Sequence, residues 1–166
     1  MVVVNDCDLR VAAGEGAAAF LDVVIGAVRD AVGGEPTAEA MAGLNGWQNT
    51  LLAYATLRDE VMEGGFVQLV QNGYGPYIFM NPFAKAVRMM GVPRLAALVN
   101  KAGKLYRANR EDLERERTDE EFMAMYEQYE RFDDIQDEFI DSEPDFAGAI
   151  AAYVDANIDQ FIDEIR

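Results

Sequence analysis

The sequence predicts an all-α protein, a single-domain irregular bundle of about seven helices over residues 1–166. Several long segments repeat hydrophobic residues at intervals of three and four, which is typical of helices with one buried face. Glycine pairs and prolines stand at the ends of these segments, where helices stop and start. A chain of 166 residues with 51% hydrophobic content can also bury a core of its own.

The N-terminal third predicts one long helix and one short one. Residues 1–14 include Val2–Val4, which fits either an edge strand or a frayed extended tail. A helical pattern starts at Glu15 and ends at Gly33-Gly34 and Pro36. Thr37 is expected to cap a short turn or helix that leads to Met41. The predicted inward residues of the long helix are Phe20, Leu21, Val24, Ile25 and Val28.

The segment Leu44–Phe66 predicts a second long helix. Gly64-Gly65 supplies residues that readily adopt positive φ at a helix C-terminus. A shorter helix is expected to run from Phe66 to Asn72-Gly73. The inward positions of the long helix are Leu44, Trp47, Leu51, Tyr54, Leu57 and Val61.

The middle of the chain predicts a connector and two further helices. Residues 72–82 are rich in turn formers and carry three aromatic residues, Tyr74, Tyr77 and Phe79. Such residues can line a ligand pocket, but aromatics that close the end of a bundle are the commoner case. Residues 83–90 form a predicted helix that Gly91 ends, and Pro93 opens the next one, which reaches about Asn109.

The segment Thr118–Asp145 carries the most unusual pattern. As one helix it places hydrophobic residues on an inward face and carboxylates on an opposite stripe about 100° wide. Ser142 is expected to cap the last helix, with Pro144 in its first turn, so that residues 118–166 form an acidic two-helix region. The inward residues are Phe122, Met125, Tyr126, Tyr129, Phe132, Phe139 and Ile140, and the stripe is Glu120, Glu127, Glu130, Asp134, Asp137, Glu138 and Asp141.

This acidic stripe is locally unfavourable. Residues 120–145 contain eleven acidic side chains and only Arg131 as a base, and each like-charged pair four residues apart costs about 0.2 to 0.5 kcal/mol. If the helix ends near Ser142, Asp137, Glu138 and Asp141 also face the negative end of its dipole. In the preceding stretch, by contrast, opposite charges stand four residues apart, which predicts the ion pairs Arg110–Glu114 and Glu111–Arg115. Either general solubility tolerates the stripe or a cationic partner requires it.

Charge is distributed by region. The chain carries 14 basic and 30 acidic residues, a formal charge of −16, which argues against binding to nucleic acid or to an anionic membrane. Residues 105–166 alone account for 6 basic and 20 acidic residues, whereas residues 47–104 hold 6 and 3. We expect the basic residues of the middle region to pair with the chain's own acidic helices. They are Lys85, Arg88, Arg94, Lys101 and Lys104.

Composition also excludes several kinds of chemistry. Without histidine there is no Ser-His-Asp or Cys-His pair and no HExxH zinc site. Cys7 is the only cysteine, so no thiolate cage forms, and the acidic run lacks the spacing of a calcium loop. We therefore expect no enzyme activity, catalytic residue, cofactor or metal site. An enzyme would need a deep aromatic pocket around a buried carboxylate such as Glu60.

No apolar run is long enough to span a bilayer, and the N-terminus has no signal-peptide pattern. A cytoplasmic location is the expectation. The sequence leaves the role of Cys7 open.

Residues 44–104 contain a recognisable motif. Leu57-x-x-Glu60-Val61-x-x-Gly64-Gly65-Phe66-x-Gln68 follows Leu44-Asn45 and Gln48 and precedes Asn72-Gly73. This pattern resembles the bacterial DNA-mimic protein family, an all-helical domain with an "NGGF" signature, although Met62-Glu63 stands where two asparagines are usual. The resemblance implies an all-α fold. It also implies a dimer whose carboxylates imitate DNA phosphates and occupy the DNA-binding surface of a transcription factor.

The residues and the resemblance together predict a non-enzymatic module that binds a basic DNA-binding protein, such as a transcription regulator, and does not bind nucleic acid directly. A homodimer is expected only from the resemblance. Two alternatives stay open: an antitoxin or immunity-type partner of a basic toxin, and an acidic helical domain with a small-ligand pocket. The expected partner-binding residues are Glu127, Glu130, Asp134, Asp137, Glu138 and Asp141.

Overall fold

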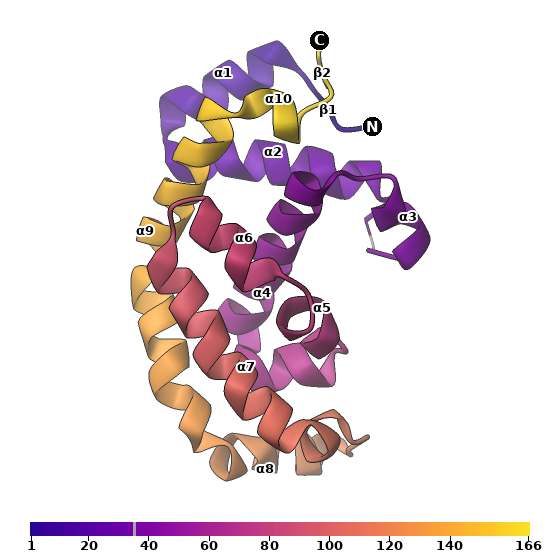
Figure 1. The fold of residues 1–166 in the computed structure, drawn as a ribbon, viewed down its shortest axis with the longest axis vertical. Coiled ribbons are helices and arrows are strands. Elements are labelled where there is room, and N and C mark those ends of the chain that lie inside the picture. The colour runs from indigo at the N-terminus through magenta and orange to yellow at the C-terminus, as the bar shows by residue number, and fades with distance from the viewer. Residues whose placement is uncertain (35) are drawn as a thin grey trace.

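The computed structural model describes residues 1–34 and 36–166 and confirms the all-α class (Figure 1). It contains ten α-helices within these residues, more than the seven expected, because several short helices accompany the long ones. The elements are β1 (Val3–Val4), α1 (Asp6–Glu15), α2 (Ala17–Ala31), α3 (Ala38–Ala42), α4 (Gly46–Gln71), α5 (Gly75–Phe79), α6 (Phe83–Met89), α7 (Pro93–Glu114), α8 (Asp119–Gln128), the 3-10 helix η1 (Glu130–Phe132), α9 (Asp133–Ala156), α10 (Ile158–Phe161) and β2 (Glu164–Ile165).

The two chain ends meet in a small parallel β-pair. Val3 of β1 lies opposite Glu164 of β2, so two residues of the Val2–Val4 run, Val3 and Val4, form a strand rather than a frayed tail. The helical pattern was predicted to start at Glu15, but the structure contains an earlier helix, α1, which starts at Asp6. The Asn5 side chain caps this helix by accepting the N–H groups of Cys7 and Asp8.

The helices share one hydrophobic core around α4, which packs against α2, α7 and α9. The inward residues predicted for α2 are its buried residues. Helix α9 connects two parts of the molecule: its first half lies beside α7, and its second half lies beside α2 (Figure 1). Thr37 caps α3 through its hydroxyl, as predicted.

A sharp corner divides α4 at Gly65. Its φ of 78° and ψ of −174° lie in a region that favours glycine, so the chain turns there before the helix resumes. The predicted break after Gly64-Gly65 is thereby confirmed. At the start of α4, Asn45 and Gln48 form a capping box in which each side chain satisfies the backbone of the other.

The acidic segment is not one continuous helix. The chain leaves α8 at Tyr129 and passes through η1 before α9 begins. The reason is the three-residue spacing of Tyr129, Phe132 and Ile135, all buried, which suits a 3-10 turn. The prediction that a new helix starts at Ser142 is also wrong, because α9 continues through Pro144 to Ala156.

Candidate functional site

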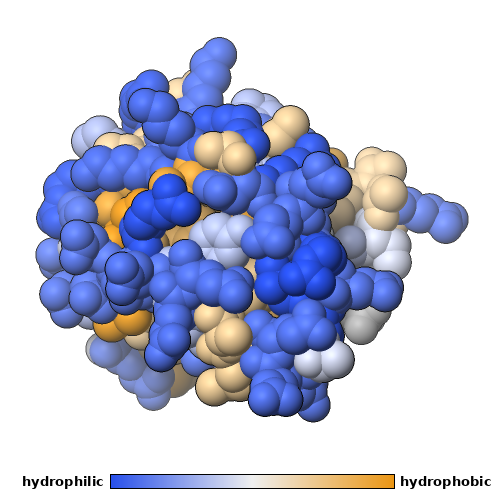
Figure 2. Space-filling view, turned by 90° about the horizontal axis from the view of Figure 1, so that it is seen from below, coloured by the Kyte–Doolittle hydropathy of each residue, from blue (hydrophilic) through white to orange (hydrophobic). Residues whose placement is uncertain are grey.

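The predicted partner-binding residues lie on three consecutive elements. Glu127 is on α8, Glu130 is on η1, and the other four are on the first half of α9. We call these six residues the acidic surface: Glu127, Glu130, Asp134, Asp137, Glu138 and Asp141. Five of them are exposed and Glu138 is half-buried. The end of the molecule formed by α8 is mostly hydrophilic, with small separate hydrophobic areas (Figure 2).

Most of the acidic surface has no internal counter-charge. Within residues 1–34 and 36–166 the single ion pair to it joins Arg94 to Glu138 at 3.8 Å, and both side chains remain well exposed. Ile140, which was predicted to point inward, is 40% exposed, and Ile135 takes its place in the core. Apart from Glu138, the carboxylates of the acidic surface are exposed and form no ion pair with a described residue.

The dipole of α9 favours the first carboxylates instead of opposing them. Asp133 and Asp134 occupy its first turn, and Asp119, Glu120 and Glu121 occupy the first turn of α8. Each acidic group at a helix N-terminus stabilises the helix by about 0.3 to 1 kcal/mol through its interaction with the dipole. The expected dipole penalty at Asp137, Glu138 and Asp141 is wrong because the helix ends only at Ala156.

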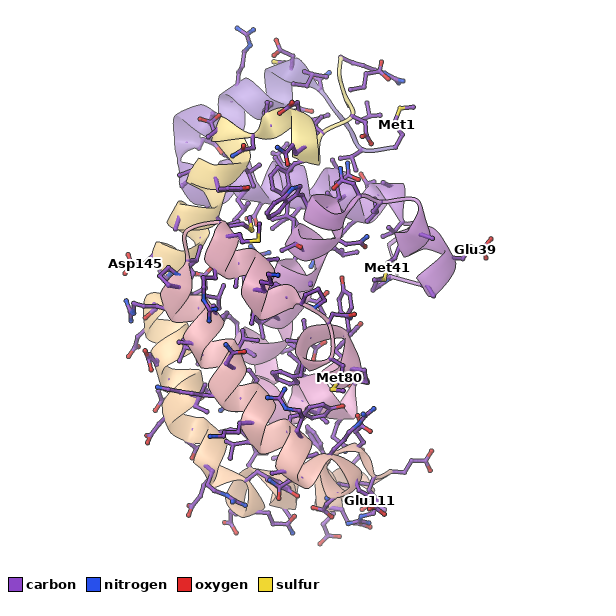
Figure 3. All side chains as sticks on the ribbon, in the orientation of Figure 1. Met1, Glu39, Met41, Met80, Glu111 and Asp145 are labelled. Atoms are coloured by element: carbon purple, nitrogen blue, oxygen red, sulfur yellow. The ribbon has the colours of Figure 1, made fainter. Side chains whose placement is uncertain are left out.

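Two exposed residues extend the surface beyond the prediction. Asp133 and Asp145 complete a row with Asp137 and Asp141, one aspartate every four residues along α9. Figure 3 shows Asp145 projecting outward from the helix. The four-residue spacing was visible in the sequence, but the expected start of a helix at Ser142 separated Asp145 from the others.

The Gly65 corner holds this acidic segment in place. The Phe66 N–H donates to the side-chain oxygen of Gln136 on α9 at 2.9 Å. The Tyr126 hydroxyl on α8 donates to the Gly64 carbonyl at 2.9 Å. The Phe66 ring stacks on Phe132 of η1 with 5.6 Å between centroids. A side chain at Gly65 would overlap the Gln136 amide, so glycine is required both for the turn and for this contact.

A second contact fixes the turn between α7 and α8. The Tyr129 hydroxyl donates to Asp112 of α7, which also forms an ion pair with Arg117 at 3.0 Å. Burial and this hydrogen bond raise the pKa of Tyr129 to about 12. The same hydrogen bond, together with Arg117 and Arg115, lowers the pKa of the Asp112 carboxyl. The hydrogen bond between the neutral Tyr129 hydroxyl and the charged Asp112 carboxylate therefore fixes the chain between α8 and η1, where the acidic surface begins.

The expected internal pairing of the basic residues is largely wrong. Arg94 contacts Glu138, but Lys85, Arg88, Lys101 and Lys104 form no ion pair with any described residue. All four are exposed.

Of the pairs predicted in α7, Arg110–Glu114 is confirmed at 3.1 Å. Arg115, however, pairs with Asp112 and Glu121 instead of Glu111.

The aromatic connector does not form a single pocket with Glu60. Tyr74 and Glu60 line one cleft of about 300 Å³, while Tyr77 lines another of about 290 Å³. Phe79 instead packs against Phe66 and Tyr106 in the core. The Glu60 carboxylate accepts hydrogen bonds from Gln68 and Asn72, so it serves as a structural link between turns.

The described residues contain no group of three or more acidic or cysteine side chains placed to hold a metal ion. None of the helices in this part of the chain combines the length and the hydropathy that crossing a bilayer requires.

Comparison with known proteins identifies a family and a relative of this chain. Residues 42–157, from the end of α3 through α9, match the family described as DMP19-like protein. The chain is also 40% identical over 76 residues to the "DNA mimic protein DMP19" of Neisseria meningitidis serogroup B. That alignment covers 46% of this chain and 46% of the relative, so the likeness spans about half the length of each protein. Because the family match includes most of the chain, this protein belongs to the DMP19-like family.

Proposed function

We propose that this protein is a DNA mimic that binds a basic DNA-binding protein and keeps it from DNA. The observation that carries this function is the row of exposed carboxylates on α9 that form no ion pair with a described residue, set on a scaffold that fixes their direction. The "DNA mimic" in the name of the Neisseria relative supports the same function. Lys and Arg side chains of the partner would form charge-assisted hydrogen bonds with these groups.

The density of charge along α9 supports the imitation of a nucleic-acid strand. Residues 133–145 carry seven exposed or half-buried carboxylates, at positions 133, 134, 137, 138, 141, 143 and 145. At 1.5 Å per residue this stretch is about 18 Å long, or about one charge per 3 Å. One DNA strand presents a charge about every 3.4 Å of axis. A protein surface that evolved to contact phosphates would therefore meet a similar number of negative charges per unit length on α9.

The proposed activity is binding without chemistry. A catalytic carboxylate normally works in a cleft that excludes water, whereas the carboxylates on α9 face solvent. We propose a transcription regulator as the class of partner and no direct contact with nucleic acid. The homodimer implied by the family resemblance stays a prediction, which light scattering of the purified protein would check.

The test is to capture the partner from the native host and to measure its affinity for matched variants. In one variant, Asp134, Asp137 and Asp141 are changed to asparagine, which removes three charges at almost constant size. We expect this variant to bind at least about 100-fold more weakly, because several charge pairs are lost together. Binding by the unmodified protein should also weaken steeply as salt is raised and should compete with the partner's own DNA.

The control variant removes the same charge from exposed positions elsewhere. Asp8→Asn, Glu39→Gln and Asp159→Asn lie on α1, α3 and α10, and Figure 3 places Glu39 far from α8. We expect the control to lose less than about threefold in affinity. Equal losses in both variants, or an affinity that does not change with salt, would show that the acidic surface does not imitate phosphates. Recovery of a basic toxin whose activity the protein blocks would favour the antitoxin alternative.

A further inference from the structure

A groove between α4 and α6 lies apart from the acidic surface. Two adjoining clefts, of about 290 and 410 Å³, share the residues Gly46, Thr50, Pro82 and Ala86. Three of these four residues are small, so the first two turns of α4 and the helix α6 leave a continuous channel between them. We call this channel the α4–α6 groove. Its size falls in the range of about 300 to 1,000 Å³ that is typical of binding sites.

The walls of the groove are apolar and partly aromatic. Met41 and Tyr77 line one cleft, while Trp47 and Met89 line the other. Met89 is 61% exposed, so its side chain is accessible to a ligand in the groove. Figure 3 shows Met41 on the inner side of α3, facing the rest of the molecule. These walls are suited to apolar side chains of a bound segment.

The rim of the groove is basic in an otherwise acidic protein. Residues 64–110 contain seven basic side chains and no acidic one, although the chain as a whole has a formal charge of −16. Lys85 lines the groove, and Arg88 lies one turn further along the exposed face of α6. Neither residue forms an ion pair in the described part of the chain. Their charges are therefore available to an acidic ligand.

We propose that the α4–α6 groove binds an acidic amphipathic segment of a partner protein. Such a segment would place apolar side chains against Met41, Trp47 and Met89 and its carboxylates against Lys85 and Arg88. Positive charge at the rim and an apolar floor together select this chemistry, because a purely acidic chain gains nothing from the walls and a purely apolar one gains nothing from the rim. The site is independent of the acidic surface on α8 and α9.

Two other ligands fit less well. Duplex DNA would have to approach a protein of charge −16, and its phosphate backbone has no apolar groups for the groove. A second copy of this chain offers carboxylates on α9, but these serve the proposed mimicry. Both ligands are included as outcomes of the test.

The probe is a fluorescein-labelled helical peptide of about 14 residues, with leucines at positions i, i+4 and i+7 and glutamates on the flanking faces. Fluorescence anisotropy measures its affinity for the full chain. Lys85→Glu combined with Arg88→Glu should weaken binding at least about tenfold. Gly46→Leu should weaken it at least about fivefold, because an added Cβ there meets no atom within 4 Å and the side chain can enter the groove without strain.

The matched control is Lys101→Glu combined with Lys104→Glu, which makes the same change of charge on the exposed face of α7. This control should weaken binding by less than about twofold, and replacing the peptide's glutamates by glutamine should abolish it.

Four results would overturn the assignment of the groove: no binding up to about 1 mM peptide, equal losses in the two charge variants, displacement of the peptide by an oligonucleotide, or a dimer that Gly46→Leu converts to monomers.

Discussion

The acidic segment α8–α9 and the acid-free residues 64–110, which run from the Gly65 corner into α7, pack against each other, yet they hardly neutralise each other. Helix α7 lies along the first half of α9, and the described residues show only Arg94 and Glu138 joined by an ion pair between these two helices. Three of the contacts that fix the acidic segment are instead uncharged: the ring of Phe66, the amide of Gln136 and the hydroxyl of Tyr126.

The use of neutral contacts in place of ion pairs between the two segments shows how a protein can keep a strong surface charge without losing much stability. An exposed ion pair contributes only about 0 to 1 kcal/mol, so little is lost when acids and bases stay apart. Apolar burial and neutral hydrogen bonds fix the geometry and leave the charges for other molecules. Removing a neutral contact should therefore cost much more than removing the charged one.

Phe66→Ala should have the largest effect. Phe66 is 1% exposed and stacks between Phe79 and Phe132, so its loss leaves a cavity where the two segments meet. We expect the free energy of unfolding to fall by about 3 to 5 kcal/mol, measured by urea denaturation. Phe122→Ala, at a half-buried position of α8, should cost only about 1 to 2 kcal/mol. Similar values for the two variants would mean that Phe66 does not join the segments.

Gly65→Ala should have the next largest effect. The added Cβ occupies a positive-φ position and overlaps Gln136, so the variant strains the corner and displaces the acceptor of the Phe66 N–H. We expect a loss of about 2 to 3 kcal/mol and faster amide exchange in the first turns of α9. Gly148→Ala on α9 is the control, because an added Cβ at Gly148 meets no atom within 4 Å. It should be neutral or slightly stabilising, and protected α9 amides in Gly65→Ala would contradict the role of the corner.

The sequence predicted elements that are set by local chemistry. The five buried residues of α2, the cap at Thr37 and the turn at Gly64-Gly65 follow from spacing and from the conformations that these residues prefer. The outward direction of the α9 carboxylates could also be predicted, because charged side chains avoid the core.

The errors arose where tertiary contacts override local signals. The pattern of Ser142 and Pro144 predicts the start of a helix, but Ser142 is buried and accepts a hydrogen bond from Arg94 at 3.0 Å. Helix α9 can continue there because its hydrophobic face packs on α2 and α7 along its whole length. The contact between the Phe66 N–H and Gln136 joins residues 70 positions apart, so no local pattern could reveal that the glycine corner positions the acidic surface.

Tyr129→Phe should have a smaller effect that depends on pH. The pKa of Tyr129 in the folded protein is raised to about 12, above the usual value of about 10. The stability from its hydroxyl is therefore present below pH 10 and is lost as pH rises toward 12. The pKa of the Asp112 carboxyl is lowered. The stability that its ionised form contributes is therefore lost in acid, as pH falls below the ordinary pKa of about 4.

At neutral pH we expect Tyr129→Phe to lower the free energy of unfolding by about 1 to 2 kcal/mol. The difference from the unmodified protein should shrink between pH 10 and 12, as measured by urea denaturation at each pH. A difference that is constant from pH 7 to pH 12 would exclude the hydrogen bond with Asp112 as its origin.

Arg94→Gln should have the smallest effect, although it removes the ion pair between the two charged segments. The side chains of Arg94 and Glu138 are 62% and 43% exposed, and their charged atoms are 3.8 Å apart, so solvent screens most of their attraction. The guanidinium also lies 5.9 Å from the Phe146 ring, an exposed contact worth about 0.5 to 1 kcal/mol. Arg94 also donates a hydrogen bond to Ser142, so we expect a total loss of about 1 kcal/mol and no more than about 1.5 kcal/mol, with little change between low and high salt. A loss above about 2 kcal/mol at low salt that disappears at high salt would show that charge, rather than the neutral corner, holds the acidic surface in place.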